Sequence, residues 1–289
     1  MIFESVINIS AGDELGALAL IKKSVSSQKS LIDIHSDIDH NRSVFTFASK
    51  NLDEVMRDAH SLISSSFECL DISSHNGVHP RIGVVDVIPF VIYDEEIGII
   101  DITSQYKFID EVKHFANEIY STFKVPIFFY DFINEEAVRT LPEIRKHAFK
   151  GILPNIGMSK PHNRYGAIAL GIRQPLVAIN VDIMTNDLLA AKAIAKQMRE
   201  SSGGIAGVRA LGLPISSQEK VQVSMNIVDL DKVNAGDVCI RVKNIASDLG
   251  FESSVELVGM IPKFHFDQLS KEFLDWSKLD SSCIIENKI

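Results

Sequence analysis

The chain has 289 residues, of which 46% are hydrophobic and 23% charged, a balance typical of a soluble globular protein with one large domain or two ordinary ones. Its formal net charge of -9 argues against a general nucleic-acid-binding protein, because such proteins present a basic surface to phosphate. The chain has three cysteines without a CxxC pair, which is typical of a reducing compartment. It shows no signal-peptide pattern and no apolar run of the ~20 residues needed to span a bilayer. These observations predict a cytoplasmic protein that binds no membrane.

Strand and helix patterns alternate through the first half of the chain. The patterns predict, in chain order, a strand at 3–9, a helix at 13–26, strands at 30–38 and 44–48, a helix at 51–65, a strand at 84–92, a helix at 104–123, a strand at 125–130 and a helix at 135–149. We expect Pro142 to break the last of these helices, because proline removes a helical hydrogen bond.

An irregular polar stretch at 154–165 precedes a strand at 166–171, and a second, similar cycle begins near Pro175. The second cycle is predicted to contain a strand at 176–183, a helix at 186–200 with an Asn or Asp cap, strands at 208–213 and 221–227, a helix at 233–249, a strand at 255–260 and a helix at 264–275. The fold class is therefore α+β, with two ferredoxin-like α/β sandwich subdomains, which we place at residues 1–175 and 176–289.

A loop with two histidines leads into the predicted strand 84–92. It reads His75-Asn76-Gly77-Val78-His79-Pro80-Arg81-Ile82-Gly83. Gly77 and Pro80 disfavour a helix here, and a loop that ends on a rigid strand can hold a side chain in place for catalysis. Histidine can both accept and donate a proton near neutral pH. A turn with two merely solvated histidines is an equally good interpretation of the loop alone.

Acidic residues and histidines also crowd the end of the predicted strand 30–38. Asp33, His35, Asp37 and Asp39 recur at period two, which would place all four on one strand face. That much charge must face water, a metal or a polar ligand. Zinc or manganese would accept the following side chains as ligands: His35, Asp37, His40, His75 and His79. No fixed ligand spacing supports a metal, so a metal-dependent hydrolase remains an alternative.

The polar segment 157–166 is a candidate site for an anionic ligand with a flat ring. Lys160 and Arg164 supply cationic donors, and His162, Asn163 and Tyr165 add hydrogen-bonding and stacking groups. The alternative is a surface connection between two elements. We expect no nucleotide cofactor, because the chain has neither a GxGxxG after its first strand nor a GxxxxGK[ST] motif.

Several motifs resemble a known family when they are taken together. The pattern His75-x-Gly77-x-His79-Pro80-Arg81-x-Gly83-x-x-Asp86-x-x-Pro89-Phe90 is similar to the signature of glutamate formiminotransferases. Residues 6–10 and 39–47 match the start and first strand pair of that family. Residues 203–212, 222–226 and 256–262 resemble its bacterial-type members, so the resemblance runs over nearly the whole chain.

The resemblance implies an activity, a fold and partners. Family members transfer the formimino group of N-formimino-L-glutamate to N5 of tetrahydrofolate, with a substrate cleft between two α/β subdomains. It implies tetrahydrofolate, with a polyglutamyl tail, as co-substrate, no metal, a place in histidine degradation, and a homodimer. A folate-binding protein that lacks transfer activity is the alternative from the same resemblance.

The resemblance also assigns residues. The catalytic histidine falls on His79. Because His35 stands where mammalian members have a carboxylate, the acidic helper is Asp37 or Asp39 or is absent, and Asp39 is assigned to the role. The assigned substrate-binding residues are Asn8, Asp37, His40, Asn41, Arg42, Arg81, Gly83 and Asp86. The assigned folate-binding residues are Gly157, Met158, Ser159, Lys160, Pro161, His162, Asn163, Arg164, Tyr165 and Gly166.

The implied chemistry needs one proton shuttle. Folate N5 attacks the amidine carbon and must lose a proton, while the departing glutamate nitrogen must gain one. A single imidazole between the two nitrogens can act first as general base and then as general acid. We expect transfer without cyclodeamination, because residues 263–289 are too few to build the second, helical module of some family members.

Overall fold

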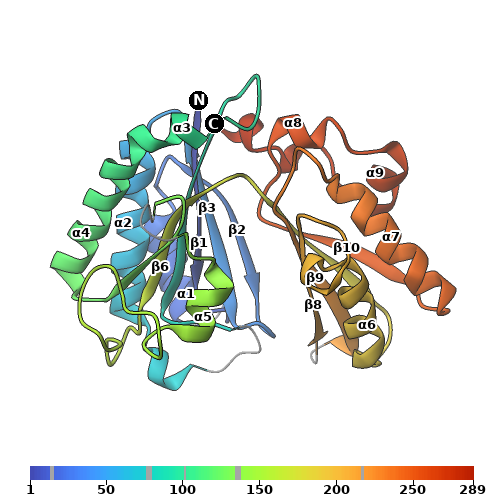
Figure 1. Cartoon of the computed structure of the whole chain (residues 1–289), viewed down its shortest axis with the longest axis horizontal. Coiled ribbons are helices and arrows are strands. Elements are labelled where there is room, and N and C mark those ends of the chain that lie inside the picture. The colour runs from blue at the N-terminus through green and yellow to red at the C-terminus, as the bar shows by residue number, and fades with distance from the viewer. Residues whose placement is uncertain (14–15, 76–79, 101, 134–137, 216–217) are drawn as a thin grey trace. The chain divides into compact units, whose positions relative to one another are not determined.

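A computed structural model describes residues 1–13, 16–75, 80–100, 102–133, 138–215 and 218–289. The chain folds into two compact units (Figure 1). Unit 1 contains residues 1–94 and 100–173, and unit 2 contains residues 95–99 and 174–288. Each unit has a β-sheet with helices packed on it, so the predicted α+β class with two sheets is confirmed.

Unit 1 is built on a six-stranded mixed sheet in the order β2-β3-β1-β4-β6-β5. Its strands are β1 (Ile2–Ile9), β2 (Leu31–Asp37), β3 (Arg42–Ser49), β4 (Val85–Tyr93), β5 (Ile127–Asp131) and β6 (Ile168–Arg173). The first four strands pair antiparallel in the order and connectivity of a ferredoxin-like fold, and β6 and β5 extend that sheet by parallel pairing.

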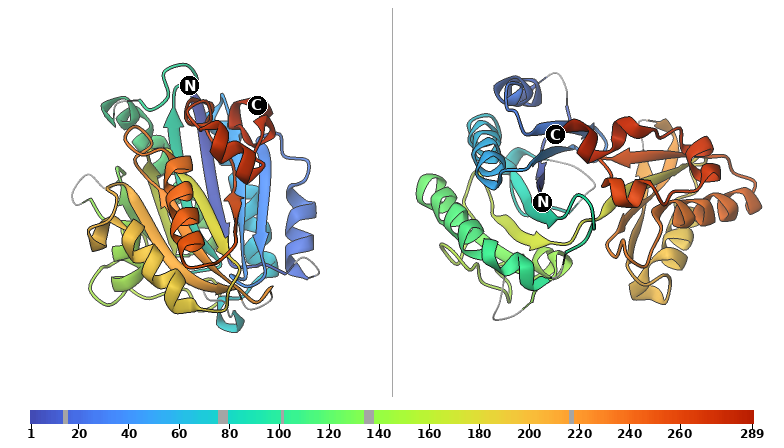
Figure 2. Two further views of the ribbon diagram at one scale, coloured as in Figure 1. Left: turned by 90° about the vertical axis from the view of Figure 1, so that its right-hand side faces the viewer. Right: turned by 90° about the horizontal axis from the view of Figure 1, so that it is seen from above.

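One face of this sheet is covered by helices α1 (Ala17–Val25), α2 (Leu52–Cys69) and α4 (Ile109–Phe123) (Figure 2). Their apolar residues recur every three or four positions, and each helix turns that stripe toward the sheet. The stripes pack on Phe45, Phe47 and Phe90, which are fully buried. Short helix α3 (Ile102–Gln105) and a 3-10 turn at Tyr106–Phe108 precede α4, so the predicted helix 104–123 is regular only from Ile109.

The opposite face carries α5 (Leu141–His147), whose Ile144 packs on Val87, Phe128 and Tyr130. The predicted helix 135–149 is wrong at its start, because residues 138–140 are not helical. Thr140 forms a capping box with Glu143, and Pro142 lies in the first turn. Proline is tolerated there because the first-turn N–H groups have no partner within a helix, so Pro142 opens α5 instead of breaking a longer helix.

Unit 2 is a four-stranded antiparallel sheet in the order β10-β7-β9-β8. Its elements are β7 (Val177–Ile183), α6 (Leu188–Met198), β8 (Val208–Ile215), β9 (Lys220–Ile227), α7 (Ala235–Asp248) and β10 (Ser253–Val258). This βαββαβ order, with the first strand between the third and fourth, is a ferredoxin-like fold and confirms the predicted architecture of the second half.

The ends of the unit 2 elements follow local capping. Asp187 caps α6 through its side chain, as predicted. The predicted helix 264–275 is instead two short helices, α8 (Lys263–Phe266) and α9 (Lys271–Ser277), because the Ser270 hydroxyl accepts from Phe273 N and starts a new helix.

Among the described residues, no helix has both the length and the apolar character required to cross a membrane.

Candidate functional site

The candidate residues of unit 1 gather at one end of its sheet, where β1 and β2 end and β3 and β4 begin (Figure 1). Asp39 lies half-buried in the turn between β2 and β3. Asn8 lies near the end of β1, opposite Val44 and Val87. His79 belongs to residues 76–79, which are outside the described part of the chain.

The β2–β3 turn is held from inside by Asp37 and Asn41. Asp37 Oδ1 accepts a hydrogen bond from His40 N at 2.7 Å, which closes the turn. Asn41 has a φ of 44°, in the left-handed region that asparagine tolerates better than most residues. Its Oδ1 accepts from Gly12 N at 2.9 Å, and its Nδ2 lies 3.0 Å from His75 Nδ1. One side chain therefore joins the turn to two other segments.

Arg81 binds the backbone of the same turn. Its Nη1 donates to the Asn41 carbonyl at 3.0 Å, and its Nη2 donates to the His40 carbonyl at 2.8 Å. Burial lowers the pKa of the Arg81 guanidinium, an effect that Asp86 opposes and Arg145 strengthens. Arg81 thus lies in the same electrostatic cluster as these two residues.

Asp86 is the centre of that cluster. Asn8 and Ile9 are consecutive in β1, but their partners in β4 are Val87 and Val85. Asp86 therefore has no partner in β1 and is the extra residue of a β-bulge. Its buried carboxylate accepts from Ile82 N at 2.7 Å through Oδ1 and forms an ion pair with Arg145 through Oδ2. The carboxylate therefore both shapes the chain before β4 and neutralises an arginine of α5.

Arg42 completes a group of three arginines around two carboxylates. Its pKa falls to about 10, first because it is desolvated and then because Arg145 and Arg81 are near, while Asp86 and Asp37 oppose the shift. Three guanidinium groups lie around two carboxylates, so these five side chains together carry a surplus positive charge. Such a cluster is suited to binding carboxylates, which guanidinium groups recognise through paired hydrogen bonds.

Sequence reasoning missed Arg145. The T-x-x-E sequence of Thr140 and Glu143 marks the start of α5, but no local signal points from that helix to Asp86, which lies 59 positions earlier in the chain. Only the packing of α5 on the sheet brings the two side chains together.

His75 lies beside this cluster as a neutral imidazole. Burial and the nearby Arg81 charge lower the pKa of His75 to about 4. It lines a pocket of about 500 Å³ together with Ser10, Asn41 and Arg164. The pocket lies between the start of α1, the end of α2 and the β2–β3 turn.

The polar segment 157–166 is irregular and largely exposed, as predicted. His162 stacks on Tyr165 with ring centroids 4.5 Å apart, and Tyr165 stacks on Phe67 of α2 at 4.3 Å. The Arg164 guanidinium donates to the carbonyls of Glu68 and Leu70, so it closes the end of α2. Lys160 is exposed, and its ammonium forms no ion pair within the described ranges.

The loop before β4 and the polar segment are joined by backbone hydrogen bonds. Val84 N donates to the Tyr165 carbonyl at 3.0 Å, and Ala167 N donates to the Ile82 carbonyl at 2.9 Å. A side chain at Gly83 would lie 2.1 Å from the Ala167 carbonyl oxygen, and Gly166 has a φ of 73°. Glycine is needed at both positions for this close approach. Two candidate segments some 80 residues apart therefore form one surface.

The acidic residues of β2 form no metal site in the described structure. Asp33, His35 and Asp37 alternate along β2, but Asp39 lies in the turn beyond it, so the prediction of four residues on one strand face is wrong for Asp39. Across the described residues, no three His, Cys, Asp or Glu side chains converge as metal ligands.

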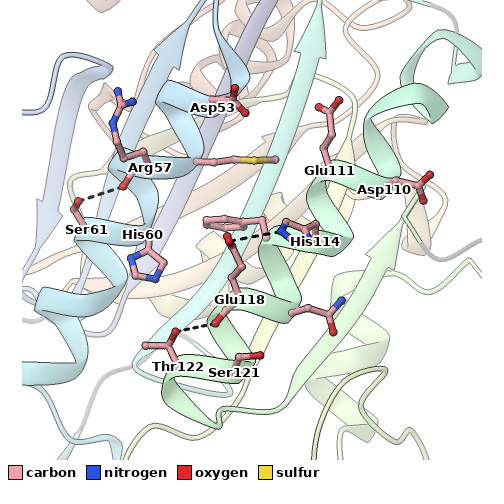
Figure 3. Close-up of a pocket in the computed structure, with 13 residues that line it drawn as sticks. Asp53, Arg57, His60, Ser61, Asp110, Glu111, His114, Glu118, Ser121 and Thr122 are labelled. Atoms are coloured by element: carbon pink, nitrogen blue, oxygen red, sulfur yellow. Dashed lines mark hydrogen bonds and ion pairs between the residues drawn. The ribbon is translucent and has the colours of Figure 1, made fainter.

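A larger pocket, of about 1020 Å³, lies between α2 and α4 (Figure 3). Its polar groups bond along their own helices. Ser61 donates to the Arg57 carbonyl at 3.2 Å, and His114 Nε2 lies 3.6 Å from Glu118 Oε1. None of the candidate residues named from the sequence lines it.

Comparisons with known proteins match the whole chain. The formiminotransferase domain, N-terminal subdomain, matches residues 2–173, and the formiminotransferase domain matches residues 178–288. A Streptococcus pyogenes protein named glutamate formimidoyltransferase is 32% identical over 305 residues, which cover 100% of this chain and 98% of that protein. A Thermoplasma acidophilum protein of the same name is 27% identical, with 99% and 96% covered. The formimidoyltransferase-cyclodeaminase of Gallus gallus is 27% identical, with 90% of this chain matching 50% of that protein.

Proposed function

The chain belongs to the formiminotransferase domain family, and from this premise we propose that it is a glutamate formimidoyltransferase, which transfers the formimino group of N-formimino-L-glutamate to N5 of tetrahydrofolate. The observation that carries the proposal is the arginine cluster around Asp86, which offers surplus positive charge to an amino-acid substrate with two carboxylates. Full-length similarity to two proteins named for this activity does not favour a folate carrier or a hydrolase.

The glutamate moiety is proposed to bind at the end of the unit 1 sheet. Arg42 and Arg81 are assigned to its carboxylates, because both guanidiniums lie in the positively charged cluster and Arg81 is already oriented by the β2–β3 turn. The other residues assigned to this part of the site are Asn8, Asp37, His40, Asn41, Gly83 and Asp86. Asp37 and Asp86 reduce the repulsion among the arginines by partly neutralising their charge.

Tetrahydrofolate is proposed to bind along residues 157–166. The His162–Tyr165 stack presents a flat face of the kind on which an aromatic ring packs. The exposed Lys160 ammonium is assigned to the glutamyl tail. Arg164 is assigned a supporting role at the same segment, since its guanidinium holds the segment to the end of α2.

The transfer itself is assigned to His79, with Asp39 as its acidic helper. The imidazole takes the proton from N5 as N5 attacks the amidine carbon, and a tetrahedral adduct forms. It then gives that proton to the glutamate nitrogen as the carbon–nitrogen bond breaks. Binding both substrates in one orientation supplies much of the rate, so no covalent enzyme intermediate and no metal are required.

The test is a spectrophotometric assay with both substrates. The purified protein should form 5-formiminotetrahydrofolate and glutamate in equal amounts, and should form neither when one substrate is omitted. Tight tetrahydrofolate binding without turnover would support the folate-binding alternative. Substrate breakdown that needs no folate and stops with a chelator would support the hydrolase. We further place the enzyme in the cytoplasm as a homodimer, and light scattering tests the second point.

Replacing Lys160 by Ala should weaken the binding of polyglutamyl tetrahydrofolate about 2- to 5-fold and leave the monoglutamate form nearly unaffected. The reason is that a contact between exposed opposite charges contributes only modestly and grows with the charge on the tail. Isothermal titration with the two folates measures the difference. Lys150→Ala, at another exposed lysine, is the matched control, and equal folate affinity in Lys160→Ala and wild type would remove Lys160 from the site.

A further inference from the structure

The Asn41 side chain joins the β2–β3 turn, to which it belongs, to Gly12 and to His75, which precedes the candidate catalytic loop. Its amide oxygen accepts from Gly12 N at 2.9 Å. That bond fixes which end of the amide is oxygen and which is nitrogen, because a backbone N–H can donate only to the oxygen. The amide nitrogen must therefore be the group that lies 3.0 Å from His75 Nδ1.

This geometry decides the tautomer of His75. The imidazole is neutral near pH 7, because burial and the Arg81 charge lower its pKa to about 4. An amide nitrogen only donates, so His75 Nδ1 must accept and the single ring proton must lie on Nε2. Nε2 is buried and has no acceptor among the described residues, which leaves a hydrogen-bond donor without a partner beside the arginine cluster.

The Asn41 backbone binds Arg81, which follows the candidate catalytic loop in the sequence. Its carbonyl accepts from Arg81 Nη1 at 3.0 Å, and its φ of 44° lies in the left-handed region. His75 and Arg81 flank residues 76–79 in the sequence. One residue thus sets the orientation of the groups on both sides of that segment.

We propose that Asn41 is a positioning residue for substrate recognition, which holds His75 with its proton on Nε2 so that this N–H donates to a carboxylate oxygen of the bound amino-acid substrate, next to Arg81. The proposal rests on the proposed function for its substrate. It changes the role assigned to Asn41 from direct binding to positioning, and it gives His75 a binding role that the assigned residues did not include.

The first experiment observes the tautomer directly, without any assay of activity. Protein labelled with nitrogen-15 histidine is measured at about pH 8 by two-bond proton–nitrogen correlation, which distinguishes a protonated ring nitrogen from an unprotonated one. The His75→Gln variant identifies the signals of His75 by their loss. Wild type should show a proton on Nε2, and a proton on Nδ1 would overturn the proposal.

The second experiment separates the two halves of Asn41. Asn41→Gly keeps the backbone carbonyl for Arg81 and accepts a positive φ without strain, but loses the amide. The KM for N-formimino-L-glutamate should rise about tenfold, the usual effect of one lost hydrogen bond, while kcat and the KM for tetrahydrofolate stay near wild type. If Asn41 had only a structural role, its loss would lower the fraction of active protein and therefore kcat. It would not raise the KM for one substrate and spare the KM for the other.

Asn41→Asp should be worse than Asn41→Gly. A carboxylate beside Nδ1 draws the ring proton to that nitrogen, so Nε2 would present a lone pair to the substrate carboxylate. Asn51→Asp is the matched control, since it makes the same chemical change at the exposed start of α2, where aspartate caps a helix equally well. The control should behave as wild type.

The outcomes distinguish this proposal from the proposed function. A wild-type KM in both Asn41 variants would overturn the positioning role while leaving the transferase activity intact. A wild-type protein with the proton on Nε2 but no formimino transfer would overturn the proposed function, and the proposed substrate of His75 with it, while the tautomer itself would stand.

Discussion

Replacing His79 by Ala should lower the turnover of formimino transfer about 10²- to 10⁴-fold, the range expected for a positioned general acid–base. The reason is that N5 cannot lose its proton, nor the leaving nitrogen gain one, without a group placed between them. The variant should fold normally and bind both substrates, so the loss should appear in kcat and not in KM. Steady-state assays with each substrate varied in turn measure both constants.

The control for His79 is His114, an exposed histidine on α4 whose ring lies 3.6 Å from Glu118. His114→Ala should keep wild-type kcat, because no candidate residue lies near it. If His79→Ala kept the wild-type kcat as well, the proton-shuttle role would have to pass to another group, and transfer by simple proximity would become the simpler account.

Asp86→Asn should lower the free energy of unfolding by about 3–5 kcal/mol, the usual cost of removing one partner of a buried ion pair. The side chains of Asp86 and Arg145 are only 4% and 18% exposed. Without this carboxylate the Arg145 guanidinium loses its ion-pair partner, and its repulsion from Arg42 and Arg81 is no longer offset. Urea unfolding followed by circular dichroism measures the change.

Asp267→Asn is the matched control for this stability effect. Asp267 pairs with Lys263 at 2.5 Å, but both side chains are about half exposed, so the loss should stay below about 1 kcal/mol. The double variant Asp86→Asn with Arg145→Gln should recover part of the stability, because it removes one charge that Asp86 neutralises. Equal unfolding midpoints for Asp86→Asn and Asp267→Asn would contradict the expected stability loss, and would mean that water solvates the arginine cluster.

The same cluster links stability to recognition. Asp86 is held by the β-bulge of β4, and Arg145 is delivered by α5. A substrate carboxylate entering beside Arg42 and Arg81 would meet guanidiniums whose charge is only partly neutralised. We therefore expect N-formimino-L-glutamate to raise the unfolding temperature, as any ligand of the native state does.

Local sequence patterns were sufficient for the elements and for the fold class. The order of strands and helices in both halves, the Asp187 cap of α6 and the irregular segment 157–166 all follow from periodicity and capping, which act over a few residues. Local patterns failed where a boundary depends on one side-chain contact. Pro142 opens α5 because Thr140 caps it, and Ser270 divides the last predicted helix in two.

By itself the sequence determined the family, the two ferredoxin-like halves and the candidate segments, because these are carried by motifs and periodicities written along the chain. Only the tertiary structure decided which side chains meet. Asn41 with His75, Asp86 with Arg145 and Gly83 with Gly166 are separated by tens of residues, and their contacts exist because the sheet and its bulge bring distant loops to one edge. No local propensity encodes such pairs, since their energy comes from desolvation and close packing, which arise only when the chain is folded.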